Sequence, residues 1–231
     1  MKNRVKTLNN SMTVKLADLL QHEPLTANQE TAFKSWDEGD NLVLTGSAGT
    51  GKTFMALYLA LEDVLEEQDY DRLVIVRSMV PTRDMGFLPG TKEEKEDAFT
   101  SPYKNICNEL FGDKASYNKM LTSGQISFDS TSFIRGTTYD NCVIVVDEMQ
   151  NLNFHELDSV ITRVGKQSKI IFSGDFKQSD FKFDDEKNGI IKFLQIVEQL
   201  KNFTIVNFGW EDIVRSDFVR DYIMTKEMLG Y

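Results

Sequence analysis

The sequence has few of the residues that build metal cages, disulfide frameworks or membrane spans. Its 231 residues include only two histidines and two cysteines. His22 and His155 have no cysteine or histidine at ligand spacing, which argues against a zinc site. Cys107 and Cys142 lie among apolar neighbours, so we expect two buried thiols rather than a disulfide. No apolar run reaches about eighteen residues, and the basic N-terminus lacks an apolar segment. We therefore expect a cytoplasmic protein with no membrane partner.

Positive charge is also in short supply. The chain has 26 basic and 36 acidic residues, which gives a formal net charge of −10. The molecule as a whole therefore does not attract nucleic acid, and binding to a strand would need a local basic strip. Hydrophobic residues at 41% and charged residues at 27% are typical of a globular domain that buries a substantial core.

One glycine-rich stretch dominates the pattern. An apolar run at 42–45 predicts a buried strand, residues 54–61 predict a helix, and G-x-x-x-x-G-K-T lies between them. The glycines let successive backbone N–H groups face one anion, and the helix N-terminus adds its unpaired N–H groups. Lys52 is expected to reach the β- and γ-phosphates, and the Thr53 hydroxyl to bind Mg²⁺. The sequence thus predicts a nucleoside triphosphate site formed by Gly46, Ser47, Ala48, Gly49, Thr50, Gly51, Lys52 and Thr53.

Two carboxylates follow the most apolar strand pattern of the chain. The unbroken valine and isoleucine run at 142–146 predicts a strand buried on both faces, as in a parallel sheet. At its carboxyl end we expect Asp147 to hold the metal ion and Glu148 to act as the general base for hydrolysis.

Two glutamines are candidates for recognising the nucleotide. An amide both donates and accepts, so Gln29, on a predicted helix ahead of the loop, suits the N6/N7 edge of adenine. Gln178 follows a predicted strand at 170–173 and is a candidate sensor of the γ-phosphate. The sequence therefore favours ATP, with Mg²⁺, as the bound nucleotide.

Apolar runs and helical patterns alternate along the rest of the chain. Predicted strands lie at residues 42–45, 73–76, 126–129, 142–146, 170–173 and 204–207. Such alternation predicts an α/β fold with a mostly parallel sheet and helices on both faces. We expect an N-terminal extension at 1–24, with a modest helical pattern, and a single domain at 25–231 with an insertion at about 82–125.

Several short motifs resemble those of known motor ATPases. The first motor domain of superfamily 1 helicases has counterparts of Gln29, the loop at 46–53, Asp-Glu-Met-Gln at 147–150 and Gly-Asp-Phe-Lys-Gln at 174–178. More closely, the chain resembles the PhoH family of ATPases, whose signatures stand at 86–90, 133–136, 147–151 and 212–215. The resemblance implies a RecA-like P-loop NTPase with an additional strand between those that carry the loop and Asp147. That placement would bring Gln178 close to the γ-phosphate.

The resemblance also raises the question of an arginine finger. Superfamily 1 helicases place arginines of a second domain on the γ-phosphate, but only about fifty residues follow Gln178 here. Such an arginine is worth about 10³–10⁵ in rate, so we expect it to come from a neighbouring subunit of a homo-oligomer. The family resemblance implies a hexameric ring. Arg215 is the first candidate, and Arg135 and Arg77 are the alternatives.

The leading interpretation is an oligomeric, helicase-like ATPase that acts on RNA or single-stranded DNA. Candidate strand contacts are Arg77, Ser78, Arg83 and Arg135. The alternative is a nucleotide-dependent switch or assembly factor whose turnover is indifferent to nucleic acid. A small-molecule kinase is disfavoured because Glu148 and Gln178 suit water activation and γ-phosphate sensing. A ribonuclease would need further metal-binding acids, and those at 180–186 are better explained as a solvated loop.

Overall fold

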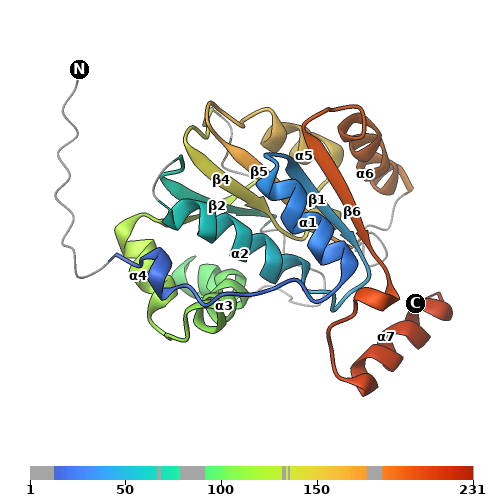
Figure 1. Cartoon of the computed structure of the whole chain (residues 1–231). Helices are drawn as coiled ribbons and strands as arrows, with labels where there is room; N and C mark the ends of the chain where they lie inside the picture. Colours follow the sequence, from blue (N-terminus) through green and yellow to red (C-terminus); the bar gives the residue numbers. More distant parts are fainter. Residues whose placement is uncertain are drawn as a thin grey trace.

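The computed structural model describes residues 13–66, 69–78, 92–131, 134, 136–175 and 184–230, with backbone only at 92–98 and 184–188. Within these ranges six parallel strands form one sheet in the order β3-β2-β4-β5-β1-β6 (Figure 1). The strands are β1 (Asn41–Gly46), β2 (Arg72–Arg77), β3 (Ile126–Ser130), β4 (Cys142–Val146), β5 (Lys169–Gly174) and β6 (Phe203–Phe208). All six predicted strands are confirmed. β5 lies between β1 and β4, which is the additional strand that the resemblance implied.

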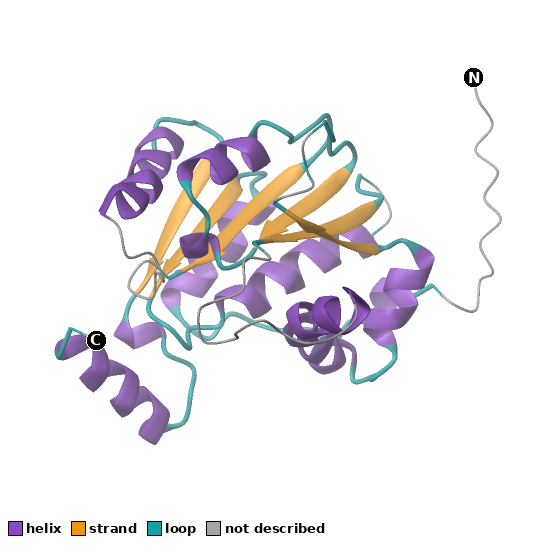
Figure 2. Cartoon of the chain, turned by 180° about the vertical axis from the view of Figure 1, so that it is seen from behind, coloured by secondary structure: helices purple, strands orange, loops and turns teal. Residues whose placement is uncertain are grey.

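Alternate residues of the strands enter two hydrophobic cores, one on each face of the sheet. Leu42 and Leu44 of β1 belong to the first core, and Val43 to the second. The helices on the first face are α1 (Ala27–Asp37), α2 (Lys52–Leu65), α3 (Lys92–Phe111) and α4 (Ser116–Ser123). Those on the second face are α5 (Phe154–Ile161) and α6 (Asp184–Val197) (Figure 2). Helices therefore cover both faces, as predicted.

The crossover from β2 to β3 contains α3 and α4. Tyr103, Cys107 and Leu110 of α3 and Met120 of α4 are fully buried in the first core. The part of the expected insertion that the structure describes is therefore packed into the centre of the protein. α3 begins at Lys92, runs through Pro102 and ends at Phe111.

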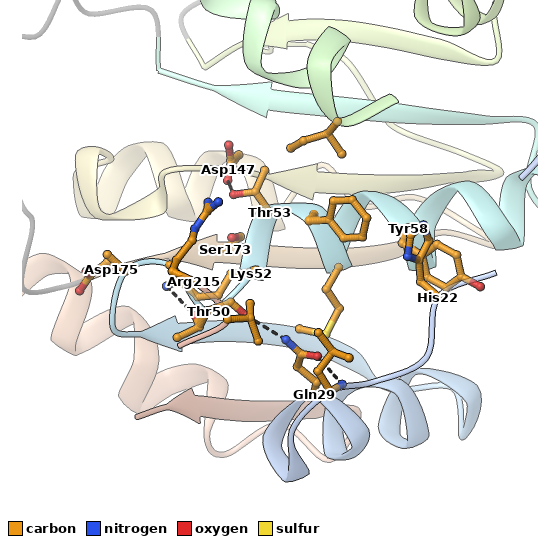
Figure 3. Close-up of a pocket in the computed structure, with 18 of the residues that line it drawn as sticks. His22, Gln29, Thr50, Lys52, Thr53, Tyr58, Asp147, Ser173, Asp175 and Arg215 are labelled. Carbon is orange, nitrogen blue, oxygen red and sulfur yellow. Dashed lines mark hydrogen bonds between the residues drawn. The ribbon is translucent and has the colours of Figure 1, made fainter. Parts of the chain in front are cut away.

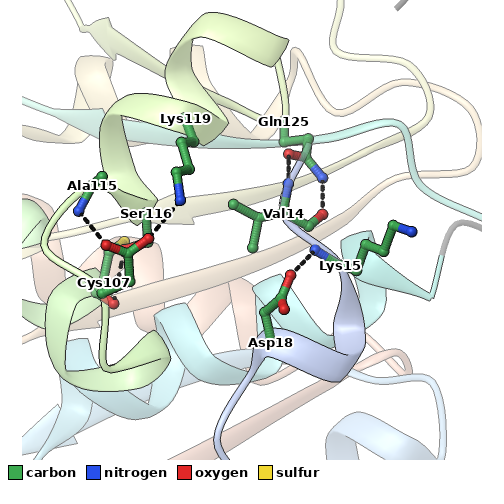
Figure 4. Close-up of polar contacts among 9 residues, drawn as sticks. Val14, Lys15, Asp18, Cys107, Ala115, Ser116, Lys119 and Gln125 are labelled. Carbon is green, nitrogen blue, oxygen red and sulfur yellow. Dashed lines mark hydrogen bonds and ion pairs between the residues drawn. The ribbon is translucent and has the colours of Figure 1, made fainter. Parts of the chain in front are cut away.

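The segment before α1 is held in a mostly extended form. The helix indicated by apolar spacing at 14–20 was wrong, because only Leu16–Asp18 form a 3₁₀ turn. The Val14 N–H instead donates to Gln125 Oε1 (3.1 Å), and the Val14 carbonyl accepts from Gln125 Nε2 (2.7 Å) (Figure 4). One buried side chain thus satisfies both backbone groups of Val14, and the segment crosses the first face without a helix of its own.

At the other end of the chain, α7 (Asp217–Met228) stands apart from the sheet (Figure 1). It follows a short 3₁₀ turn at residues 210–212. None of its residues is buried, and Phe218 is 80% exposed.

The state of the two cysteines can be compared with its prediction. Cys107 and Cys142 are buried free thiols, as predicted. Burial raises the pKa of the Cys107 thiol to about 12, so that thiol is protonated at neutral pH. Of the helices in the described part of the chain, none is long and apolar enough to cross a bilayer.

Candidate functional site

The predicted phosphate loop joins the carboxyl end of β1 to the first residue of α2 (Figure 3). Gly51 is the N-cap of α2 and has a left-handed backbone with φ +82°, which strains other residue types. Because glycine has no side chain to cap the helix, the first N–H groups of α2 stay available to an anion. The loop therefore has the local structure of a phosphate cradle.

Lys52 lies inside this cradle. Its Nζ donates to the carbonyl oxygens of Gly46 (2.9 Å) and Ser47 (2.7 Å), and only 9% of the residue is exposed. Burial lowers the pKa of Lys52, and nearby acids oppose that shift. These acids, in decreasing order of effect, are Asp175, Glu148, Asp147 and Glu227. The site thus concentrates negative charge around one ammonium group.

Asp147, which follows β4, is held by hydroxyl groups from two helices. Thr53 Oγ1, at the start of α2, donates to Asp147 Oδ1 over 2.8 Å. The Tyr103 hydroxyl, on α3, donates to Asp147 Oδ2 over 3.0 Å. Burial, followed by the charge of Asp147, raises the pKa of Tyr103 well above its usual range, so Tyr103 is a donor at neutral pH. Thr53 and Asp147, which are 94 residues apart in the sequence, are thus direct neighbours.

This pair suits a magnesium ion. A hydroxyl and a carboxylate are hard oxygen ligands, and Mg²⁺ usually takes one or two carboxylates together with phosphate oxygens and waters. Thr53 lies in the first turn of α2, and its hydrogen bond brings Asp147, which follows β4, to the same place beside the cradle. When bound there, Mg²⁺ would neutralise negative charge on the phosphates.

Glu148 has an unusual backbone conformation. Its φ is +53°, which is left-handed and rare for this residue type. Gln150 Nε2 donates to Glu148 Oε2, while Gln150 Oε1 accepts from the Asp175 N–H over 3.0 Å. Burial and then the charge of Asp147 raise the pKa of Glu148, and Arg77 opposes that shift. Gln150 therefore connects the general-base candidate to the end of β5.

Arg77 faces the same acids. It ends β2, which pairs with β4, so Arg77 and these acids lie close together within one chain. Burial opposes its charge, but Tyr103, Glu148 and Asp147 together raise the pKa of Arg77. Arg77 was a candidate strand contact and an alternative finger, and the structure places it against the acids of its own site.

Gln29 supports the phosphate loop directly. Its Nε2 donates to the Thr50 carbonyl (3.1 Å), and its Oε1 accepts from the Leu25 N–H (2.8 Å). The residue is only 7% exposed. Gln29 thus connects the loop to the segment before α1. One amide hydrogen and one lone pair of its side chain remain for hydrogen bonds to a nucleotide base.

Arg215 lies over the loop of its own chain (Figure 3). The Val214 N–H donates to the Gly49 carbonyl over 3.1 Å, and a Cβ placed on Gly49 would be 3.0 Å from Arg215 Cγ. Asp212 anchors this segment by accepting from Asn28 Nδ2 over 2.7 Å. Arg215 can therefore reach the cavity without a neighbouring subunit.

α7 also contacts the loop. Glu227 Oε2 accepts from Ser47 Oγ (3.2 Å) and from Trp210 Nε1 (2.7 Å). A Cβ on Gly49 would lie 3.2 Å from Ile223 Cδ1. One side of α7 thus rests on the loop, and the exposed side carries Phe218, Tyr222 and Met228.

A cavity of about 650 Å³ extends from the loop into an apolar arm. We define the arm by His22, Leu25, Phe33, Phe54 and Tyr58, and the cavity lining also contains the polar residues Gln21, Glu23 and Glu109. The His22 ring packs edge-on against Phe54 and Tyr58, at centroid distances of 5.0 and 5.6 Å. The volume is that of a small-molecule site, and the arm offers apolar surface for a nucleotide base.

The cavity brings together most of the predicted site residues. Its lining includes Gln29, residues 48–53, Asp147, Glu148 and Arg215. Gln178, Arg83, Arg135 and the signature at 86–90 lie outside the described residues. Sequence reasoning assigned no role to Tyr103, Gln150 or Glu227. Only Gln150 had a local signal, its place in the Asp-Glu-Met-Gln motif, because Tyr103 and Glu227 reach the site from distant helices.

Comparison with known proteins gives one family. The sequence model of the PhoH-like protein family matches residues 21–226. Protein PhoH2 of Bacillus subtilis (strain 168) is 37% identical over 164 residues, which are 69% of this chain and 37% of that protein. A PhoH-like protein of Synechocystis sp. is 31% identical over 203 residues, 87% of this chain and 61% of that protein. The chain thus spans less than two thirds of the length of these relatives.

Solved structures show the same fold. The large terminase of a thermophilic bacteriophage, in complex with ADP, superposes with a TM-score of 0.52. The sequences are 13% identical, and the match covers 89% of this chain and 50% of the terminase. The six-stranded sheet is therefore that of a RecA-like P-loop domain.

Proposed function

Because the chain belongs to the PhoH-like protein family, we propose that it binds ATP with Mg²⁺ and hydrolyses it. The observation that carries the proposal is the hydrogen bond between Thr53 and Asp147. It joins the start of α2 to the acid after β4, and hydrolysis by a P-loop enzyme needs these two groups on one metal ion.

Each side chain of the site has a role in this reaction. Lys52 and the loop N–H groups would bind the β- and γ-phosphates, and Thr53 and Asp147 would hold Mg²⁺. Glu148 would orient a water and accept its proton, with Gln150 keeping the carboxylate in place. Gln178 remains the proposed γ-phosphate sensor.

We assign the base to the apolar arm of the cavity. Adenine would pack against Leu25 and Phe54, while the free hydrogen and lone pair of Gln29 face its polar edge. This assignment is what favours ATP over other triphosphates.

The wider proposal is a helicase-like motor that acts on RNA or single-stranded DNA as a homo-oligomeric ring, with six subunits as the working number. The free thiols suit a reducing compartment, which supports a cytoplasmic location. Arg215 is the proposed finger, and its position over the loop of its own chain favours action in cis.

The decisive experiment is the steady-state ATPase rate with and without single-stranded RNA, at low and moderate salt. Lys52→Ala and Glu148→Gln serve as controls for the site. A several-fold stimulation that weakens with salt and is lost in both variants is the expected result. An absence of turnover in the wild-type protein with Mg²⁺ would contradict the ATPase proposal.

A nucleotide-dependent switch with a protein partner is the second candidate. The exposed apolar side of α7, with Phe218 80% and Tyr222 64% exposed, favours it. Turnover that neither RNA nor DNA changes would support this interpretation over the motor.

A further inference from the structure

A tyrosine outside the recognised motifs touches the centre of the site. Tyr103 is fully buried on α3, and its hydroxyl donates to Asp147 Oδ2 over 3.0 Å. We propose that Tyr103 is a positioning residue for the metal ion, because it holds the Asp147 carboxylate in the orientation that binds Mg²⁺ with the nucleotide. This inference rests on the proposed function and adds to it a residue from the β2–β3 crossover.

The two hydroxyl groups that donate to Asp147, from Thr53 and Tyr103, differ in their position relative to the cavity. Thr53 belongs to the cavity lining and is itself an expected metal ligand. Tyr103 is not part of the lining, so it contacts Asp147 from outside the cavity. Nucleotide and metal could therefore bind in the cavity without breaking the hydrogen bond between Tyr103 and Asp147.

The position of Arg77 agrees with the direction of this hydrogen bond. The guanidinium lies beside the Tyr103 phenol, and a guanidinium can only donate. The phenol oxygen must accept on that side, which leaves its hydrogen for Asp147 Oδ2.

The ring of Tyr103 has little freedom to move the hydroxyl away. It is fully buried in the first core and packs against Phe128, at a centroid distance of 6.0 Å. Removal of the hydroxyl alone would leave one oxygen of Asp147 without this partner and would weaken the control of its orientation.

The test is Tyr103→Phe, which keeps the ring and removes the hydroxyl. Manganese serves as the paramagnetic substitute for magnesium, because both accept hard oxygen ligands. We expect Mn²⁺ affinity in the presence of ADP, measured by electron paramagnetic resonance, to fall about tenfold, which is within the range for loss of a group that orients a metal ligand. ADP affinity in EDTA should stay unchanged, and turnover should recover at raised Mg²⁺.

Tyr139→Phe is the matched control. Tyr139 is also buried, and its hydroxyl donates to an aspartate, Asp129 Oδ2, over 2.8 Å, but it belongs to the second core. This variant should leave Mn²⁺ affinity unchanged, and thermal unfolding of both variants measures the cost of losing a buried hydroxyl.

Three results would overturn the inference. Unchanged Mn²⁺ affinity in Tyr103→Phe, with ADP binding intact, would exclude a positioning role and leave the proposed function standing. Loss of ADP binding in EDTA would assign Tyr103 to packing instead. A wild-type protein that binds no ADP at all would remove the proposed function and this inference with it.

Discussion

The strained backbone at Glu148 is informative at the scale of single residues. A non-glycine residue with φ +53° costs about 1–3 kcal/mol and persists only where its surroundings hold it. Gln150 provides that support, because its side-chain amide forms hydrogen bonds with both the Glu148 carboxylate and the Asp175 N–H. The strained backbone and Gln150 together therefore fix the direction of the Glu148 carboxylate, which is the proposed general base.

Replacement of Gln150 should separate chemistry from binding. We expect Gln150→Ala to lower kcat by about 10- to 100-fold, since small displacements of a reacting group have effects of this size. The KM for ATP should change little because Gln150 does not belong to the phosphate loop. Steady-state kinetics checks both values.

Gln125→Ala is the control for this prediction. Gln125 is also a buried glutamine, but its side chain holds the backbone of Val14 (Figure 4) and is not part of the cavity lining. The Gln125→Ala substitution should lower the temperature of unfolding and leave kcat unchanged. An equal fall of kcat in both variants would mean that Gln150 acts through stability alone.

At the scale of elements, the loop is supported from three directions. Gln29 of α1 holds the Thr50 carbonyl, Val214 holds the Gly49 carbonyl, and Glu227 of α7 accepts from Ser47. Two of these supports are neutral, whereas Glu227 places a carboxylate close to Lys52. α7 therefore places a negative charge beside the loop, and this charge would repel a bound phosphate.

Neutralising Glu227 should tighten nucleotide binding. Glu227→Gln keeps an oxygen for Ser47 and Trp210 but removes the charge that would repel the phosphates. We expect ADP and ATP to bind up to about fivefold more tightly at low salt, with a smaller gain at high salt. Isothermal titration calorimetry at two ionic strengths measures this difference.

Asp221→Asn, on the same helix and exposed, removes the same charge without a contact to the loop. An equal gain of affinity in both variants would attribute the effect to net charge and not to the position of Glu227.

The whole molecule carries a net charge of −10, so any strand-binding surface must be a local one. Arg77 is unsuited to that surface because it faces Asp147, Glu148 and Tyr103 of its own chain. An oligomeric motor would therefore depend on other basic residues and on the arrangement of its subunits. Arg215 is the residue through which that arrangement can be tested.

Mixing two inactive proteins distinguishes action in cis from action between subunits. Arg215→Ala alone should lower kcat by about 10³-fold or more if Arg215 is the finger. Because Arg215 lies over its own loop, a mixture of Arg215→Ala and Lys52→Ala proteins should be no more active than the two measured apart. Recovery of turnover in the mixture would place the finger in trans.

The sequence by itself determined the strands of the sheet and the position of the candidate nucleotide site. Apolar runs predicted the four inner strands because a parallel strand buried on both faces tolerates few polar residues, whereas the edge strands β3 and β6 are only partly buried and were predicted from shorter, more polar runs. The loop and the Asp147–Glu148 pair were recognisable because each depends on neighbouring residues in the chain, whose spacing is read directly.

Only the tertiary structure decided how distant segments complete the site. Tyr103 and Glu227 come from helices with no motif of their own, and their contacts with Asp147 and Ser47 arise from packing on the sheet. The mostly extended path at residues 14–20, interrupted by a 3₁₀ turn, had the same cause, since Gln125, more than one hundred residues away, holds the backbone of Val14. Local periodicity carries no information on such contacts, because their free energy depends on groups that meet only when the chain is folded.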